Sequence, residues 1–423
     1  MEQLATTEKR VWTKDINSNQ WHTLVAGTLG WGLDAFDQTI YSFTIISLIA
    51  EWNITTVETG VAATAMMAAS AVGGVLFGWL SDRIGRMKVL TITILMYGCL
   101  TGVCALSTNI WMLVAFRALT GLGLGGEWSA GSALISETFP AEHRGKALGI
   151  MQAGYAIGGI LAAAFGGMIV ENFGWRWIFV VGALPAFLVF YVRRNVPESQ
   201  VWLDYQAKKK AGIVDQEEKP KAKLGAIYIP KIIVGILFAS FICSYSWPMG
   251  TFMATYLATP VDGGGAGQTI THASQLQISL FVGALIGYIV FGYVADKIGR
   301  KKTFIIWMIP AIVVSMCQVY FATISLTLYI VFAFLNGIFG TGMIAGFGPI
   351  LNEMFPTNLR GFAAGLCYNS GRGVASAMVT FVGYMFLFYP MRVVLMACPL
   401  LIIGAMIMMI FIRESKGIDV SKI

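Results

Sequence analysis

The chain has 423 residues, of which 57% are hydrophobic and 12% are charged, and its formal net charge is +7. Soluble proteins average roughly 45–50% apolar and about 25% charged residues, so this composition excludes an ordinary soluble protein. The six cysteines lie in apolar stretches without a CxxC pair, and the three histidines are scattered. Neither a disulfide framework nor a metal site is therefore expected, and no cofactor is expected either.

Hydrophobic segments of membrane-spanning length follow one another along most of the sequence. A helix needs about 20 apolar residues to cross roughly 30 Å of hydrocarbon, and twelve such helices are predicted from the sequence. Their expected ranges are 22–50, 57–80, 88–107, 110–138, 146–170, 174–195, 229–258, 275–295, 302–322, 325–352, 361–388 and 391–413. The fold class that this pattern predicts is an all-α polytopic membrane protein.

The longest hydrophilic segment, 196–227, divides the predicted spans into six and six. We therefore expect an N-terminal six-helix bundle over 1–195, a cytoplasmic linker over 196–228 and a C-terminal six-helix bundle over 229–423. The halves also repeat each other, because "GWLSDRIGRMK" at 78–88 returns as "GYVADKIGRKK" at 292–302. Parallel repeats of this kind place a substrate cavity at their interface near the middle of the membrane.

The distribution of charge in the loops predicts the orientation in the membrane. Lys and Arg are frequent in 82–88, 141–146, 193–223 and 296–302, whereas the alternate loops, such as "EWNITT" and "VDGGGAGQTITHAS", contain none. The positive-inside rule then places both termini in the cytoplasm. The expected location of the protein is the inner or plasma membrane of a cell. The net charge reflects this topology, so the lipid bilayer is an expected partner and nucleic acid is not.

These residues resemble the major facilitator superfamily over the whole chain. Its loop signature, G-x-x-x-D-x-x-G-R-x-K, occurs twice, after the second and eighth predicted spans. "GWGLDAFD", "GLGLGGEW", "RGKALGIMQAGYAIG" and "YNSGR" are similar to the sialate/lactate–proton symporter branch. The resemblance implies two six-helix bundles related by a pseudo-two-fold axis and transport by alternating access. The sequence differs from known members in two ways. It lacks the two additional middle spans that some sialic-acid members carry, and it lacks the double glutamine of sugar porters.

The first copy of the loop signature supplies expected gate residues. Gly78 and Gly85 allow a tight turn and close backbone approach. Asp82 stands where a carboxylate caps a helix or pairs with an arginine. The basic residues expected to reach Glu137, which lies near Arg144, are Arg83, Arg86 and Lys88. The resemblance implies a latch at the cytoplasmic gate in the outward-open state, and contact with lipid headgroups is the alternative.

The second half supplies the counterparts of these gate residues, in matching places of the repeat: Asp296, Gly299, Arg300, Glu353 and Arg360. Individual exposed ion pairs contribute only about 0–1 kcal/mol, which suits a latch that has to open again. The glycines of "GLGLGGEW" and "GYAIGG" have no preceding strand and lie within predicted spans. Close helix packing therefore explains them better than nucleotide binding.

Charged residues inside the predicted spans carry most of the functional information, because each is costly in hydrocarbon. Asp34 and Asp37 lie three residues apart, so their side chains share one helix face. Two partly desolvated carboxylates there do not both ionise readily, and the pair is expected to hold a coupling proton. The alternative is that one of the two simply forms a structural ion pair with Arg117 or Arg372.

Arg372 lies near mid-membrane between two glycines and suits a bidentate substrate carboxylate. A salt bridge to the first span is the alternative, and the two contacts can alternate. Further substrate-binding candidates are Asn369, Tyr368, Gln152, Tyr155, Arg117 and Glu127. Each of these polar residues can equally be an interhelical contact.

The function expected from these residues is proton-coupled symport of a small organic acid, such as lactate, sialate, a sugar acid or an aromatic acid. A carrier of sugars, polyols or other neutral solutes, or a drug exporter, remains an alternative, although a neutral ligand leaves Arg372 unexplained. A non-transporting receptor on the same fold is a third possibility. Catalytic arrangements are missing from the sequence, so no enzyme is expected, and the protein is expected to be a monomer.

Overall fold

The computed structural model describes residues 16–139, 141–211, 228–355 and 360–414. The helices of the first half are α1 (Ser18–Trp52), α2 (Thr56–Ile84), α3 (Arg86–Cys104), α4 (Ile110–Thr138), α5 (Ala141–Phe173), α6 (Trp175–Val181), α7 (Pro185–Asn195) and α8 (Gln200–Lys210). Those of the second half are α9 (Ile229–Ala258), α10 (Ile270–Leu276), α11 (Ile278–Ile298), α12 (Arg300–Phe321), α13 (Leu326–Asn336), η4 (Gly337–Thr341), η5 (Gly342–Gly346), α14 (Phe347–Glu353), α15 (Arg360–Met385), α16 (Met391–Ala397), η6 (Cys398–Leu400) and α17 (Leu401–Phe411). The described residues contain no strand.

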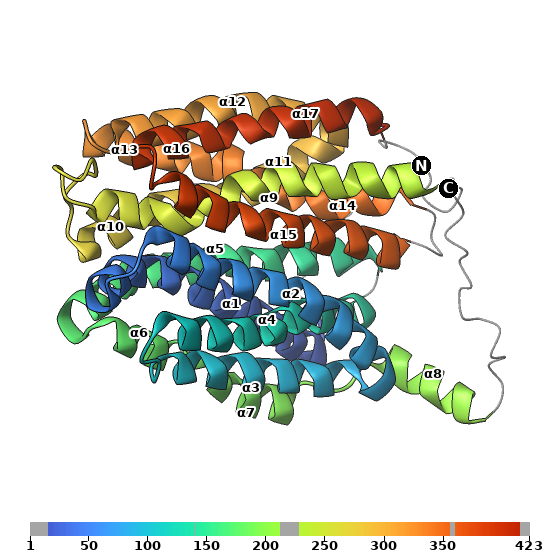
Figure 1. The fold of residues 1–423 in the computed structure, drawn as a ribbon. Helices are drawn as coiled ribbons and strands as arrows, with labels where there is room; N and C mark the ends of the chain where they lie inside the picture. Colours follow the sequence, from blue (N-terminus) through green and yellow to red (C-terminus); the bar gives the residue numbers. More distant parts are fainter. Residues whose placement is uncertain (1–15, 140, 212–227, 356–359, 415–423) are drawn as a thin grey trace, which may run out of the picture.

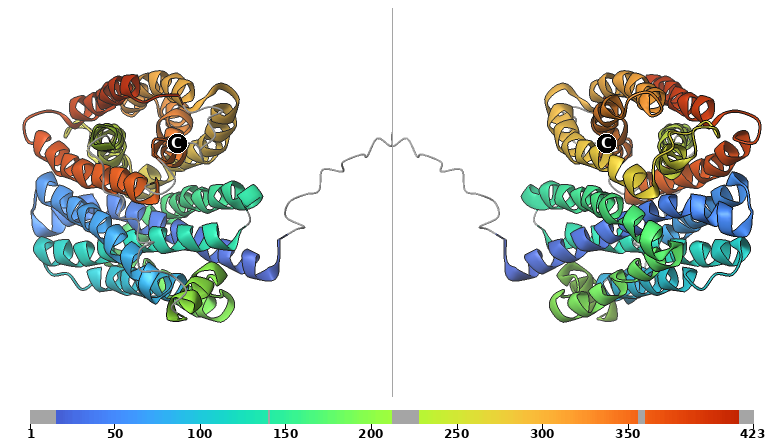
Figure 2. Two further views of the ribbon diagram at one scale, coloured as in Figure 1. Left: turned by 90° about the vertical axis from the view of Figure 1, so that its right-hand side faces the viewer. Right: turned by 90° about the vertical axis from the view of Figure 1, so that its left-hand side faces the viewer.

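The helices form two bundles that lie side by side (Figure 1). Figure 2 shows the blue-to-green helices of the first half below the yellow-to-red helices of the second. The predicted fold class, two six-helix bundles, is confirmed. In the described residues, nine helical segments are long and apolar enough to cross a membrane. Helices α1, α4 and α15, which carry the charges found in the sequence, are not among these nine.

Several predicted spans are interrupted helices. The span expected at 174–195 consists of α6 and α7, and α7 begins at Pro185. The span expected at 325–352 changes from α-helix to the π-helical η4 and the 3₁₀-helical η5 within "GIFGTGMIAG". Glycine lowers helix propensity, and π and 3₁₀ turns within a helix often mark functional sites or hinges. The hydrophobic length alone did not reveal these breaks.

Glycines bring neighbouring helices into backbone contact. A methyl group at Gly158 of α5 would overlap the carbonyl oxygen of Gly32 in α1. A methyl group at Gly121 or Gly125 of α4 would overlap the carbonyl oxygens of α2. The prediction that the glycine runs serve close helix packing is confirmed.

The two halves repeat one local structure where α2 meets α3 and where α11 meets α12. Gly85 and Gly299 have positive φ angles of 113° and 109°. At the first junction, Glu198 Oε1 accepts hydrogen bonds from the backbone N–H groups of Arg86 (2.8 Å) and the following residue (3.1 Å). At the second, Glu414 Oε1 accepts from the N–H of Arg300 at 2.8 Å. Each glutamate therefore caps a helix N-terminus.

We call the end of the bundles that carries these two junctions the basic end, and the other the far end. At the far end, hydrogen bonds link α2 to α15. Thr56 Oγ1 donates to the carbonyl oxygen of Gly383 at 2.8 Å. Thr64 Oγ1 lies 2.5 Å from the carbonyl oxygen of Ser376 and 2.8 Å from the hydroxyl of Thr380. These contacts join the first half of the chain to the second.

A second far-end contact links α5 to α10. Glu171 Oε2 accepts a hydrogen bond from the N–H of Thr271 at 3.0 Å. The N–H of Gly167 donates to the hydroxyl of Ser274 at 3.2 Å. Four residues of the first half therefore form hydrogen bonds to the second half at the far end: Thr56, Thr64, Gly167 and Glu171. We call this set of contacts the far-end latch.

Candidate substrate cavity

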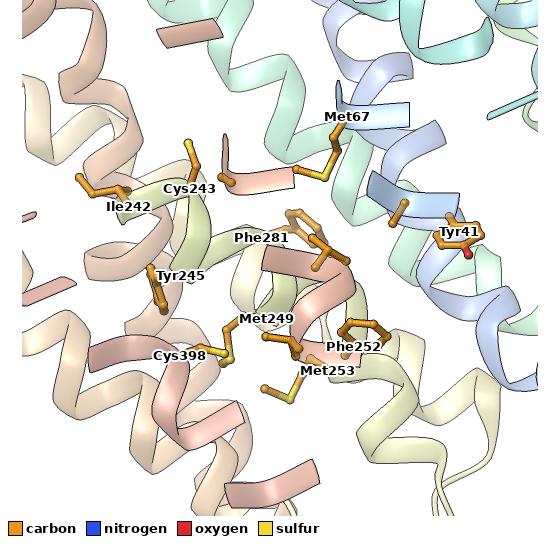
Figure 3. Close-up of a cluster of buried hydrophobic side chains, with 14 of the residues drawn as sticks. Tyr41, Met67, Ile242, Cys243, Tyr245, Met249, Phe252, Met253, Phe281 and Cys398 are labelled. Atoms are coloured by element: carbon orange, nitrogen blue, oxygen red, sulfur yellow. The ribbon is translucent and has the colours of Figure 1, made fainter. Parts of the chain in front are cut away.

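A cavity of about 170 Å³ lies between the two halves. Its walls come from α1, α2, α4 and α5 of the first half and from α9, α11, α12, α13, η4, η5 and α15 of the second. Eight aromatic side chains line it: Trp31, Tyr41, Tyr155, Tyr245, Trp247, Phe281, Tyr288 and Tyr368. Figure 3 shows one apolar part of the wall, where Met249 and Met253 of α9 lie near Phe252. Among the residues that the structure describes, the lining includes two arginines and no carboxylate.

Arg372 of α15 lines the cavity and is 5% exposed. Its guanidinium carbon lies 5.5 Å from the ring centre of Trp247 and 5.6 Å from that of Tyr368. Its Nε has no hydrogen-bond partner, and none of the described carboxylates forms an ion pair with it. A buried guanidinium held by ring faces alone retains its donors for an anion.

Arg117 of α4 also lines the cavity, but its charge is balanced. Its Nη1 lies 3.1 Å from Asp37 Oδ2, and Asp37 Oδ1 accepts a hydrogen bond from Thr101 Oγ1 at 2.6 Å. The guanidinium carbon also lies 4.7 Å from the ring centre of Tyr41. Helices α1, α3 and α4 are thus joined by one buried polar cluster, and both oxygens of Asp37 have partners.

Asp34 has different surroundings, although it shares a helix with Asp37. It is 1% exposed and accepts a hydrogen bond from the amide of Gln38, which lines the cavity. In the described part of the chain, no arginine or lysine lies within ion-pair distance of Asp34. The two aspartates that the sequence suggested as one pair therefore have separate partners.

The remaining substrate candidates divide into two groups. Tyr368, Gln152 and Tyr155 line the cavity, and Gln152 Oε1 has no hydrogen-bond partner among the described residues. Glu127 and Asn369 do not line it. Asn369 donates to the carbonyl oxygen of its own helix at Gly365, 3.1 Å away, and its side chain faces Gly74 of α2. Glu127 packs against α1 at Gly30.

The expected gate residues are described in part. Arg86 Nη2 lies 3.0 Å from Glu137 Oε1, as the sequence suggested. Arg83 instead places its guanidinium carbon 3.9 Å from the ring centre of Trp79. Gly78 lies in α2, one residue before that tryptophan. The side chains of five further gate candidates lie outside the described residues: Asp82, Arg144, Asp296, Glu353 and Arg360.

Sequence reasoning missed several wall residues. Gln38 directly follows Asp37 and stands four residues after Asp34, so its position on the same helix face was a usable signal. Trp247 precedes Pro248 inside α9, and a proline within a helix was also readable. Gln318 and Asn336 hydrogen-bond to each other at 2.6 Å in the wall, and nothing in the sequence pairs them.

The profile of the Major Facilitator Superfamily matches residues 28–276 and 263–422. The chain is 31% identical to the sialic acid transporter NanX of Escherichia coli (strain K12), over 85% of this chain and 86% of that one. It is 30% identical to the probable 4-methylmuconolactone transporter of Cupriavidus pinatubonensis, over 88% and 85%. In a solved structure, the xylose transporter XylE from E. coli superposes with a TM-score of 0.75 and 19% identity, over 95% of this chain and all of that one.

The chain belongs to the major facilitator superfamily and is a multi-pass membrane transporter, not an enzyme. Its relatives are metabolite and organic-acid transporters of this superfamily, so the expected family is confirmed. The likeness to XylE establishes the fold alone.

Proposed function

We propose that the protein takes up a small organic acid together with a proton by alternating access. The observation that carries this proposal is Arg372, a buried cavity arginine without a carboxylate partner in the described residues. A cation buried without a counter-ion is costly. A substrate carboxylate that binds its fork of donors supplies the direct ion-pair partner that Arg372 lacks.

Charge balance links substrate binding to the proton. Asp37 and Arg117 neutralise each other, so Arg372 and Asp34 remain as the mid-membrane charges that face the cavity or its immediate wall. In the empty cavity, the negative charge of Asp34 balances Arg372 electrostatically. When a carboxylate occupies Arg372, Asp34 takes up a proton, and one anion travels with one proton.

The positive-inside rule assigns the basic end to the cytoplasm. Both termini then lie on the cytoplasmic side of an inner or plasma membrane. The far-end latch then joins the two halves on the external side. Sialic acid is an acid that a relative with 31% identity is named for transporting, and this supports an acid substrate. A monomer suffices, because the cavity is formed within one chain.

The test uses purified protein in proteoliposomes and labelled lactate, benzoate and sialate, with xylose as the neutral control. We expect one or more of the acids to accumulate when the outside is acidic, and not without the pH gradient. Arg372→Lys should bind the transported acid weakly, because an ammonium group cannot reproduce the planar fork. Accumulation of xylose instead of any acid, or equal binding of an acid and its amide, would contradict the proposal.

A further inference from the structure

Three neutral amide side chains lie together in the part of the cavity wall that the second half of the chain provides. Gln277, Gln318 and Asn336 line the cavity and are 6%, 1% and 3% exposed. Gln277 stands between α10 and α11, Gln318 belongs to α12, and Asn336 is the last residue of α13. We call these three side chains the amide wall. The proposed binding of a carboxylate and a proton does not involve them.

Buried hydroxyl groups hold the amide wall in place. Asn336 Oδ1 accepts hydrogen bonds from the hydroxyls of Tyr245 and Ser315 at 2.6 and 2.8 Å. Asn336 Nδ2 donates to Gln318 Oε1 at 2.6 Å, and Gln318 Nε2 donates to the hydroxyl of Tyr329 at 3.3 Å. These bonds connect α9, α12 and α13. The positions of the two central amides are therefore fixed from several helices.

The backbone next to the amide wall leaves room for this cluster. The π-helical η4 begins directly after Asn336. A methyl group at Gly340 of η4 would overlap both Asn336 Oδ1 and the Tyr245 hydroxyl. Buried polar groups cost free energy unless they are paired, and π-helical turns inside helices are frequent at functional sites. A polar wall of this kind at a cavity is better explained by ligand binding than by helix packing alone.

The hydrogen bonds within the cluster leave part of its capacity unused. An amide has two N–H donors and an oxygen that accepts two hydrogen bonds. Among the described residues, one N–H of Asn336 has no partner, and Gln318 has one N–H and one acceptor position without a partner. A hydroxyl group donates as well as accepts, so it can satisfy both kinds of group. A second carboxylate cannot, because the described lining from the second half contains no cation besides Arg372.

We propose that the amide wall is a second subsite of the cavity, which binds the hydroxyl groups of a polyhydroxylated monocarboxylate such as a sugar acid. This inference rests on the proposed function, in which Arg372 binds the carboxylate. Arg372 and the amide wall line the same cavity, so one substrate contacts both. The carbon chain between its two ends packs against the aromatic side chains of the lining. The charged end and the neutral polar wall together fix the orientation of the substrate.

The first experiment measures binding to the purified full-length protein by isothermal titration calorimetry. Its three probes have carbon chains of equal length: gluconate carries a carboxylate and hydroxyls, hexanoate only the carboxylate, and sorbitol only hydroxyls. A site that binds hydroxyls rejects a ligand without them, because its buried donors and acceptors then stay unpaired. We expect gluconate to bind at least about tenfold more tightly than hexanoate, and also more tightly than sorbitol. The comparison uses the wild-type protein, so it does not depend on the folding of a variant.

The second experiment repeats these titrations with Gln318→Met, which keeps the length of the side chain and removes its amide. The affinity for gluconate should fall by roughly 2–12-fold, as expected for the loss of one hydrogen bond, and the affinity for hexanoate should stay unchanged. Gln268→Met is the matched control. Gln268 belongs to the same half, lies outside the cavity lining and donates to the carbonyl oxygen of Ala266 at 3.0 Å. This variant should bind the three probes like wild type.

The outcomes separate this inference from the proposed function. If hexanoate binds as tightly as gluconate, or if no probe binds, the inference is overturned. Equal losses of affinity for gluconate and hexanoate in Gln318→Met would overturn it as well, because the amide wall would then only pack helices. If sorbitol binds as tightly as gluconate, the carboxylate contributes nothing. That result would overturn the proposed function and leave the hydroxyl subsite in place.

Discussion

Arg117 of α4 and Asp37 of α1 form an ion pair of 3.1 Å in which the two side chains are 2% and 0% exposed. Both charges lie between helices of the first half, and Thr101 of α3 donates to the second carboxylate oxygen. Because both carboxylate oxygens of Asp37 have partners and both side chains are buried, the pair joins its helices. Of the two alternatives for the aspartates, structural pairing therefore fits Asp37, and the coupling role is the one that we propose for Asp34.

The first prediction follows for stability. Asp37→Asn leaves Arg117 buried without its counter-charge, and breaking a buried pair in this way costs roughly 3–5 kcal/mol. We expect a clearly lower melting temperature of the detergent-purified protein. Replacing both partners, as in Asp37→Asn with Arg117→Gln, should cost less than Asp37→Asn alone, because no isolated charge remains. A double variant at least as unstable as the single one would show that the pair does not act as a unit.

The second prediction concerns the contact between α1 and α5. Gly158→Ala places a methyl group on the carbonyl oxygen of Gly32, so the helices have to separate and the melting temperature should fall. Overpacking of a tight contact typically costs about 1–3 kcal/mol. Gly149 of the same helix has no heavy atom within 4 Å of a built Cβ, so Gly149→Ala is the matched control. An equal effect of the two substitutions would contradict the packing role.

The third prediction uses the repeat of the two halves. Glu198→Ala and Glu414→Ala each remove a carboxylate from a helix N-terminus, and loss of a cap costs about 0.5–2 kcal/mol. Because the two glutamates occupy equivalent places, we expect similar losses of thermal stability and of transport. Glu58 of α2 caps a helix at the far end, so Glu58→Ala should lower stability without the same loss of transport. If only one of the two substitutions lowered thermal stability and transport, the two glutamates would not be equivalent in function.

Much of this architecture could be predicted from sequence because it depends on properties of single segments. Span length follows from hydrophobic runs, and the paired junctions at Gly85 and Gly299 follow from the repeated loop motif. Buried charges were visible for the same reason, since Asp34, Asp37 and Arg372 each interrupt an apolar run. Their burial in the structure agrees with that pattern.

The choice of partners could not be predicted, because spacing along one helix says nothing about its neighbours. Asp34 and Asp37 are three residues apart on α1, yet their hydrogen-bond partners differ. Asp37 contacts side chains of α3 and α4, whereas Asp34 accepts a hydrogen bond from Gln38 of α1 itself. Asn369 stands only three residues before Arg372 on α15, but it faces α2 rather than the cavity. Such differences depend on how the helices are rotated against one another.

The last prediction tests the far-end latch. Thr64→Val removes the hydroxyl that contacts Ser376 and Thr380 without changing the shape of the side chain, whereas Thr64→Ser retains the hydroxyl. A hydrogen bond contributes about 0.5–1.5 kcal/mol net. At about 1.4 kcal/mol per tenfold, its loss should shift the population toward a state open at the far end by roughly 2–12-fold.

The shift can be measured with a cysteine in the cavity. Met249 lines the cavity wall, so Met249→Cys, with the six native cysteines changed to serine, reports access of an impermeant maleimide from the outside. Thr64→Val should label faster than the parent protein, and Thr64→Ser should label at the parent rate because its hydroxyl still bonds to α15. If valine leaves labelling unchanged, or serine accelerates it equally, the Thr64 hydroxyl does not hold the far end closed. The closure would then have to rest on the other contacts of the far-end latch, those of Thr56 with Gly383, Gly167 with Ser274 and Glu171 with Thr271.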